Sequence, residues 1–276
     1  MMMMIVPESN AGHAGEIIEE LQNVAAERKL KMIVRGHYIP KGDPERPIGE
    51  DAFFILEEEQ TIGVADGVGG WSVHGIDAGD YARELMKNAM KAIETEPKGL
   101  VDPKSVLNKA FLSTKSQGSS TASIVTLKNN MLHGVNVGDS RLRLFRKNSL
   151  FYESPIQQHK FNKPYQLGNH ESSDKPNVAD EYQVSVKDGD IVVMGSDGLW
   201  DNVYPNEIVE TLWQNSLGGM LDIQGLATFI AKLAFNKSKQ TDIATPFSVA
   251  AQEAGYTNTG GKIDDITVFV AYIDFV

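Results

Sequence analysis

The segment from Asp51 to Gly67 constrains the fold more strongly than any other part of the sequence, because its pattern fits two strands joined by a tight turn. Two apolar runs flank the polar stretch EEEQ, which is typical of an antiparallel hairpin. If residues 56–60 carry the turn, positions 51 and 66 lie opposite one another. The hairpin therefore brings Asp51 and Asp66 together at its open end.

The rest of the chain alternates short strand patterns with amphipathic helical patterns. The runs TASIVTL, MLHGVNV and RLRLFRK, separated by the turns NN and GDS, predict a meander, and EYQVSVKDGDIVVMG predicts a second hairpin that turns at Asp188 and Gly189. Two further strands are expected, MIVRGHYIP near the start and DITVFVAYI at the end. Helical spacing of apolar residues predicts helices over 15–30, 77–97, 102–115, 205–216, 222–237 and 246–254. Antiparallel runs separated by helices indicate an α+β fold.

The domain organisation expected from this pattern is simple. The 276 residues fit one large sandwich or barrel, and no internal repeat, low-complexity segment or linker divides them. We expect an N-terminal segment over 1–30, which contains the amphipathic helix, followed by one domain over 31–276.

Composition excludes several classes of function. The chain has no cysteine, so a disulfide framework, thiol catalysis and thiolate zinc sites are ruled out. A formal net charge of -11 disfavours nucleic-acid binding, because the surface repels phosphates. No apolar run approaches the roughly 20 residues that span a bilayer. We therefore expect a soluble, intracellular protein that is a monomer, without nucleic acid or membrane as partner.

Carboxylates recur where predicted strands begin or end, beside glycines or turns. Such a set can converge at one sheet edge, and the mutual repulsion would then favour bound cations. All-oxygen ligands favour magnesium or manganese over zinc. Aspartate is also common in turns for structural reasons. For any one of these residues, a structural role in a turn is therefore as much to be expected as metal binding. The carboxylates of this kind are Glu50, Asp51, Asp66, Asp139, Asp197, Asp201, Asp264 and Asp265.

Six segments in a fixed order resemble the metal-dependent serine/threonine protein phosphatases, the protein phosphatase 2C family. They are RPIGEDAFF, VADGVGGW, GSSTASIV, VNVGDSRLRLFR, VVMGSDGLWDNV and KIDDITVFVA, spread over residues 46–271. The run QQHKFNKPYQL is similar to the branch with mitochondrial and plant organellar members, so the location is expected to be cytoplasmic, or mitochondrial or plastid if a transit peptide is missing from this chain. The resemblance implies a single-domain sandwich of two antiparallel sheets flanked by helices, with 31–276 as the catalytic domain.

The resemblance also implies a ligand set for two magnesium or manganese ions and a third, weaker one. Asp66 would bridge both ions, with the Gly67 carbonyl completing a coordination sphere. Asp197 and Asp264 would bind the first ion, whereas Glu50 would reach the second largely through water, with Asp51 as its neighbour. Asp139 and Asp201 match the weaker third position. The implied activity is hydrolysis of phosphoserine and phosphothreonine in phosphoprotein substrates by a metal-activated bridging water.

Arg46 lies four residues before Glu50, the spacing at which the family places its phosphate-binding arginine, and Arg35 is the competing candidate. A guanidinium can hold two phosphate oxygens at once. The sequence departs from the better-known pattern at Val68, where a histidine would serve as general acid. His74 is the nearest replacement, although a histidine in that polar loop is more often a plain surface residue.

Two alternatives to an active phosphatase remain. A catalytically weak or inactive pseudophosphatase would keep the fold as a binding module, but it would be expected to lack core ligands, and Asp66, Asp197 and Asp264 are present. A calcium-binding structural domain would need its ligands clustered in one loop, and here they are scattered.

Overall fold

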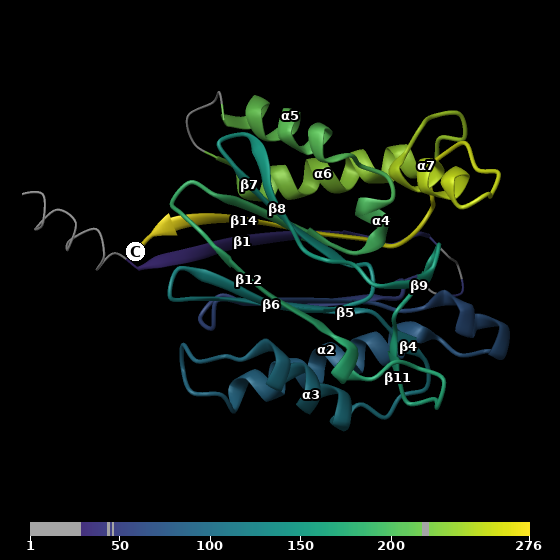
Figure 1. Ribbon diagram of the computed structural model, residues 1–276, viewed down its shortest axis with the longest axis horizontal. Coiled ribbons are helices and arrows are strands. Elements are labelled where there is room, and N and C mark those ends of the chain that lie inside the picture. Colours follow the sequence, from purple (N-terminus) through teal and green to yellow (C-terminus); the bar gives the residue numbers. More distant parts are fainter. Residues whose placement is uncertain (1–28, 43–44, 46, 217–220) are drawn as a thin grey trace, which may run out of the picture.

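The computed structural model of the protein describes residues 29–42, 45, 47–216 and 221–276. Figure 1 shows two antiparallel sheets stacked face to face, with helices on both outer faces. The predicted α+β sandwich of two antiparallel sheets flanked by helices is confirmed. No helix in these described ranges is both long and apolar enough to cross a membrane.

Each main sheet has five strands. The first has the order β1-β14-β13-β7-β8 and the second β12-β6-β5-β3-β2. The first sheet contains β1 (Leu30–Ile39), β7 (Arg141–Arg146), β8 (Ser149–Glu153), β13 (Ile191–Gly195) and β14 (Ile266–Phe275). The second contains β2 (Asp51–Leu56), β3 (Thr61–Asp66), β5 (Ala122–Lys128), β6 (Met131–Val137) and β12 (Asp180–Ser185). Short strands form two small ribbons, β4 (Ser119–Ser120) with β11 (Leu167–Gly168) and β9 (Gln158–Lys160) with β10 (Lys163–Pro164).

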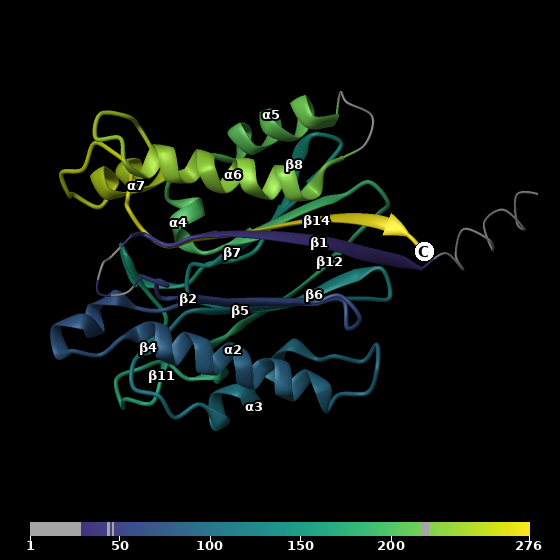
Figure 2. The same ribbon diagram turned by 180° about the vertical axis from the view of Figure 1, so that it is seen from behind.

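Helices cover the outer face of each sheet (Figure 2). The second sheet is covered by α2 (Ala78–Glu94) and α3 (Pro103–Ser113), and the first by α5 (Pro205–Ser216) and α6 (Ile223–Ser238). Shorter helices are α4 (Asp197–Trp200), α7 (Pro246–Glu253) and the 3₁₀ turns η1 (Gly69–His74) and η2 (Pro176–Val178). The helix α2 begins where the Asp77 side chain accepts a hydrogen bond from the Gly79 amide at 2.9 Å.

Three apolar layers hold the sandwich together, one between the sheets and one under each pair of helices. Successive residues of a strand contribute to different layers, as the alternation of side chains requires. In β5, for example, Ile124 packs under α2 and α3, whereas Val125 packs between the sheets. Both main sheets are therefore buried on both faces over much of their area.

The predicted hairpin over 181–195 is wrong. The strand β12 pairs with β6 in the second sheet, whereas β13 pairs with β7 and β14 in the first. The turn at Asp188 and Gly189 carries the chain from one sheet to the other. A turn sequence fixes a reversal of direction but not a pairing partner, and β13 is buried enough to need a neighbour on each side.

The predicted meander is correct only in part. The strands β5 and β6 pair as expected, but β7 joins the other sheet. The chain crosses at Gly138, which has a φ of 101° and leaves so little space that an added Cβ would lie 2.6 Å from the Thr121 side chain. Asp139 follows Gly138 directly, so the crossing places it at the edge of the sandwich.

Most predicted helices are present with small shifts of their ends, as α2, α3, α5, α6 and α7. The short helix α4 and the turn η1 were not predicted. Of the helix predicted over 15–30, residues 15–28 lie outside the described residues. Leu30 begins β1 instead of ending a helix, because the apolar pattern that follows pairs along the whole of β14.

Candidate metal centre

Strand register explains why distant carboxylates meet at one edge of the sandwich. Asp51 lies directly opposite Asp66 in the hairpin of β2 and β3, as predicted. In the other sheet, Gly195 pairs with both Arg141 and Val268, so the end of β13 meets the start of β7 and β14. Asp139, Asp197 and Asp264 lie within a few residues of those pairs.

These side chains line a cleft of about 290 Å³ between the two sheets. Asp66, Gly67 and Val68 enter it from the second sheet, and it also contains Asp139, Asp197 and Asp264. A Cβ on Gly67 would lie 2.7 Å from the Glu50 carbonyl oxygen, so only glycine fits there. We call Asp66, Asp139, Asp197, Asp201 and Asp264 the open cluster.

A lysine ammonium lies in the middle of the open cluster. The Lys262 Nζ is 2.9 Å from Asp201 Oδ2 and 3.2 Å from Asp264 Oδ2, and it also contacts Asp197 Oδ2. Its side chain is 17% exposed. Sequence reasoning missed this residue, although its place two residues before Asp264 was the available signal.

A second lysine lies at the other side of the cleft. The Lys41 Nζ contacts the buried Glu50 carboxylate and is 3.8 Å from Asp265 Oδ2. Both ammonium groups therefore neutralise carboxylates that were predicted as metal ligands or as their neighbours.

Two other carboxylates at this edge are held by hydrogen bonds from the protein, and we call Asp51 and Asp265 the anchored pair. Asp51 Oδ2 accepts from the Ser196 hydroxyl at 2.7 Å and from the Thr267 hydroxyl at 2.6 Å. Asp51 lies in the second sheet and its donors lie in or beside the first, so these bonds join the sheets.

Asp265 accepts three hydrogen bonds. The Lys41 amide donates to Oδ1 at 2.8 Å, the Glu50 amide donates to Oδ2 at 2.8 Å, and the Tyr38 hydroxyl donates to Oδ1 at 3.2 Å. Only 2% of Asp265 is exposed. It therefore fixes the loop that carries Glu50, whereas its neighbour Asp264 faces the cleft.

Burial and crowding shift the proton equilibria of the open cluster. Burial, followed by the charges of Asp197 and Asp51, holds the pKa of Asp66 well above its usual range. Burial and the charge of Asp197 raise the pKa of Asp139 to about 7. Burial acts most strongly against ionisation of Asp197, but the Lys262 charge together with hydrogen bonds from Asp66, Lys262 and the Gly198 amide outweighs it and lowers the pKa of Asp197. The cluster thus carries more carboxylate than its single lysine can balance.

The ligand atoms at this site are of the chemical type that divalent cations prefer. Among the described residues, Asp51 Oδ1, Asp139 Oδ1 and Asp197 Oδ1 are buried without a hydrogen-bond partner, which is costly unless a cation or water pairs with them. All are hard oxygen donors of the type that magnesium and manganese prefer. Within the described ranges no three acidic or histidine side chains surround one point as they would a bound ion. The Lys262 ammonium lies where some of these carboxylates would otherwise converge.

The remaining predicted residues lie elsewhere. Arg46 is outside the described residues. Arg35 Nη1 is 2.7 Å from Glu57 Oε1, at the turn end of the β2–β3 hairpin and opposite the end that carries Asp51 and Asp66. His74 is exposed and lines a neighbouring hollow of about 720 Å³ with Trp71, not the carboxylate cleft.

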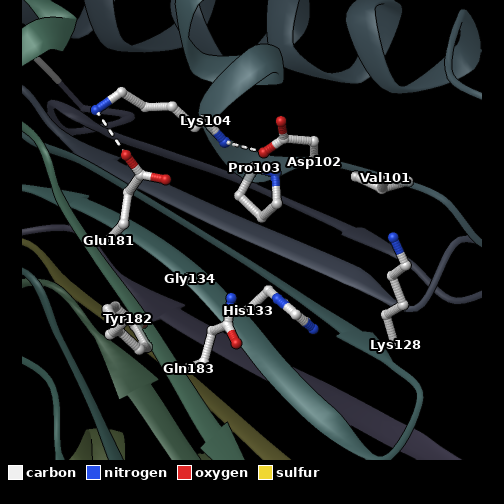
Figure 3. A pocket seen from close by; sticks show the side chains of 10 residues that line it. All are labelled: Val101, Asp102, Pro103, Lys104, Lys128, His133, Gly134, Glu181, Tyr182 and Gln183. Atoms are coloured by element: carbon white, nitrogen blue, oxygen red, sulfur yellow. Dashed lines mark hydrogen bonds and ion pairs between the residues drawn. The ribbon is translucent and has the colours of Figure 1, made fainter.

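Another hollow, of about 350 Å³, lies beside α3 and the strands β6 and β12 (Figure 3). Its charged side chains are engaged locally, since Lys104 Nζ is 3.3 Å from Glu181 Oε1 and Asp102 accepts from the Lys104 amide at 3.0 Å. It shares no lining residue with the carboxylate cleft. It does not resemble a reaction centre.

Comparison with known proteins gives a consistent result. No family model matches the chain. A curated relative named probable protein phosphatase 2C 55, from Arabidopsis thaliana, is 46% identical over 261 residues, which cover 94% of this chain and 56% of that protein. The chain thus spans about half the length of this relative.

Solved structures also match. The photosystem II phosphatase PBCP is 31% identical with a TM-score of 0.80, and the match covers 87% of this chain and 98% of that one. The catalytic domain of the serine/threonine protein phosphatase PstP, solved with two manganese ions, is 18% identical with a TM-score of 0.62, covering 89% of this chain and all of that one. The latter likeness concerns the fold alone.

Proposed function

Because the chain belongs to the protein phosphatase 2C family, we propose that it hydrolyses phosphoserine and phosphothreonine in proteins with the help of bound magnesium or manganese. The observation that carries the proposal is the open cluster at the sandwich edge. Its carboxylates exceed the positive charge available to them, and buried oxygens in it have no hydrogen-bond partner among the described residues. The resemblance in sequence and the match to phosphatase structures support the same assignment.

Within this proposal, Asp66 would be the chief ligand of two cations. Asp66 projects into the cleft between the sheets, where Asp197 and Asp264 approach it from the opposite side. The Gly67 carbonyl and Glu50 complete the set. Bound cations of this kind activate a water and neutralise charge that develops on the phosphoryl group. Manganese is the first cation to test, because the PstP catalytic domain was solved with it.

The protein's own groups would bind and orient the phosphate. Arg46 is the proposed phosphate clamp, because a guanidinium holds two oxygens of one phosphoryl group. The pairing of Arg35 with Glu57 at the far end of the hairpin favours Arg46 over Arg35. Val68 lines the cleft but cannot donate a proton, so the leaving oxygen must take its proton from solvent or from another group.

The pseudophosphatase alternative has no support. A binding module that had lost catalysis would be expected to lack core ligands, whereas Asp66, Asp197 and Asp264 all line the cleft.

A phosphopeptide hydrolysis assay tests the proposal. Protein stripped with EDTA should be inactive toward phosphoserine and phosphothreonine peptides, and added Mn²⁺ or Mg²⁺ should restore turnover. A matched phosphotyrosine peptide serves as the specificity control. Full turnover in EDTA, or no turnover in saturating Mn²⁺, would show that the proposal is wrong.

A further inference from the structure

Lys262 is fixed in the cleft by its backbone as well as by its charge. Asn202, which is fully buried, donates from Nδ2 to the Lys262 carbonyl at 2.9 Å and accepts from the Lys262 amide at 3.0 Å. The same Nδ2 donates to the Gly198 carbonyl at 2.9 Å. This side-chain amide therefore clamps the lysine onto α4, the helix that carries Asp197.

The ammonium contacts carboxylates from two separate segments. Asp197 and Asp201 lie at the two ends of α4, and Asp264 lies just before β14. The contact to Asp201 at 2.9 Å is a charge-assisted hydrogen bond, and Asp197 accepts a second one. Asp264 Oδ2, at 3.2 Å, forms an ion pair with the same ammonium.

From this geometry we propose that Lys262 is a built-in cation that occupies the face of the cleft between Asp197 and Asp201. A divalent ion cannot enter that face while the ammonium remains, since like charges at such a separation repel strongly. Asp201 is then the partner of Lys262 and not a metal ligand. The cleft holds two divalent ions instead of three, and the identity of those ions rests on the proposed function.

The remaining carboxylates fit this division. Asp66 is not among the residues that contact Lys262, and Asp197 and Asp264 each have a second carboxylate oxygen. In each, Oδ2 contacts Lys262 and Oδ1 would be the oxygen offered to the ions, although Asp264 Oδ1 also accepts from the Asp265 amide at 3.0 Å. Asp197 Oδ1 is the clearest case, because it is buried without a hydrogen-bond partner among the described residues while Oδ2 contacts the lysine.

Calorimetric titration of the full chain with Mn²⁺ alone, after EDTA treatment, tests the proposal. The unaltered protein should bind two ions. Lys262→Met should bind one more, and adding Asp201→Asn to that variant should remove the additional ion. Lys262→Arg, which keeps the positive charge, should bind two. An unchanged or smaller number of ions in Lys262→Met would overturn the proposal.

Two controls keep the test decisive. Lys237 also forms a mostly buried ion pair, at 2.6 Å from Glu207, but outside the cleft, so Lys237→Met should bind two ions. If Lys262→Met does not fold, as judged by circular dichroism, Asp201→Asn alone decides the question. The proposal expects Mn²⁺ affinity within about twofold of the unaltered protein, and a loss of tenfold or more, about 1.4 kcal/mol, would contradict it.

The outcome is separable from that of the proposed function. A protein that gains an ion in Lys262→Met but hydrolyses no phosphopeptide would support this inference and refute the activity. An active phosphatase whose ion count does not respond to Lys262→Met would retain the activity and refute this inference alone.

Discussion

Asp264 and Asp265 are neighbours in the sequence, yet they belong to regions of opposite character. Asp264, in the open cluster, is balanced by the Lys262 ammonium at 3.2 Å and faces the cleft. Asp265, in the anchored pair, accepts from two backbone amides and a tyrosine hydroxyl and is 2% exposed. The difference lies in the donors. Neutral donors fixed in the fold use both oxygens of Asp265, whereas Asp264 accepts from one amide, that of Asp265, and otherwise faces the Lys262 ammonium and the cleft.

The same contrast separates Asp51 from Asp66, which face each other across β2 and β3. Asp51 is held by two hydroxyls from the opposite sheet. Asp66 instead shares the cleft with Asp197, and its raised pKa reflects burial together with the negative charges of Asp197 and Asp51. We therefore expect substitutions of Asp66, Asp197 and Asp264 to change cation binding and turnover, and substitutions in the anchored pair to change stability.

The largest effect is expected for Asp66→Asn. The substitution keeps the size of the side chain but removes the charge nearest to both proposed ions, so turnover should fall by roughly a hundredfold to a thousandfold, the loss typical of one preorganised electrostatic group. Phosphopeptide turnover and Mn²⁺ titration measure it. Folding should survive, because the change relieves repulsion.

Asp188→Asn is the matched control, since it removes one charge from an exposed turn. It should leave Mn²⁺ binding and turnover unaltered. Near-normal Mn²⁺ binding and turnover in a folded Asp66→Asn protein would refute the placement of Asp66 between the ions.

Asp265→Asn should instead weaken the fold. An asparagine amide cannot accept on its nitrogen, so one of the buried amides of Lys41 and Glu50 would lose its partner, at a cost of about 1–3 kcal/mol in the free energy of unfolding. Asp264→Asn should cost less, because burial and the charge of Asp197 raise the pKa of Asp264 and so already disfavour its ionised form. Denaturant unfolding in EDTA compares the two. Equal losses of unfolding free energy in the two variants would contradict the distinction between the open cluster and the anchored pair.

Stability of the metal-free protein should fall as pH rises toward neutrality. The pKa of Asp139 is raised from 3.8 to about 7, so between those values the folded state binds a proton that the unfolded chain has released. That stabilisation is complete below the lower value and is lost through the higher one, with a fall of up to about 4 kcal/mol. Unfolding curves in EDTA from pH 4 to pH 8 measure it.

Asp139→Asn should flatten this dependence, because the variant has no proton to release at that position. If the free energy of unfolding falls equally with pH in both proteins, groups other than Asp139 cause the fall.

The smallest effect is expected for Thr267→Val. This change removes one of two hydroxyl donors to Asp51 and keeps the shape of the side chain, so it should cost about 1 kcal/mol of unfolding free energy. Ser196 continues to hold the carboxylate at 2.7 Å. Mn²⁺ affinity should not change, and a marked change would mean that Asp51 acts as a ligand.

Local chemistry was enough to predict the features that depend on neighbouring residues. The turn at 56–60 fixed the register of Asp51 and Asp66, and helical spacing located α2. The pairing of β12 and β13 was mispredicted because the turn between these strands suits either a hairpin or a crossing from one sheet to the other. Only packing against distant strands decides between these.

The site was predictable in its types of residue and less so in its arrangement. Side chains of successive residues in an extended chain point to opposite sides, so Asp264 and Asp265 had to differ, but which of them faces the cleft depends on the other sheet. Lys262 was missed because its contact with Asp201 joins residues far apart in the chain. Arg46 remains a prediction, since it lies outside the described residues.

The two sides of the cleft belong to different sheets, since Asp66 ends β3 and Asp197 follows β13. The distance between these carboxylates therefore depends on the distance between the two sheets. A cation bound between them would hold the two sheets together. A partner that slides or spreads the sheets would therefore change the affinity for the cation, even if it binds at the far end of the molecule. By thermodynamic reciprocity, the cation would change the affinity for that partner by the same factor.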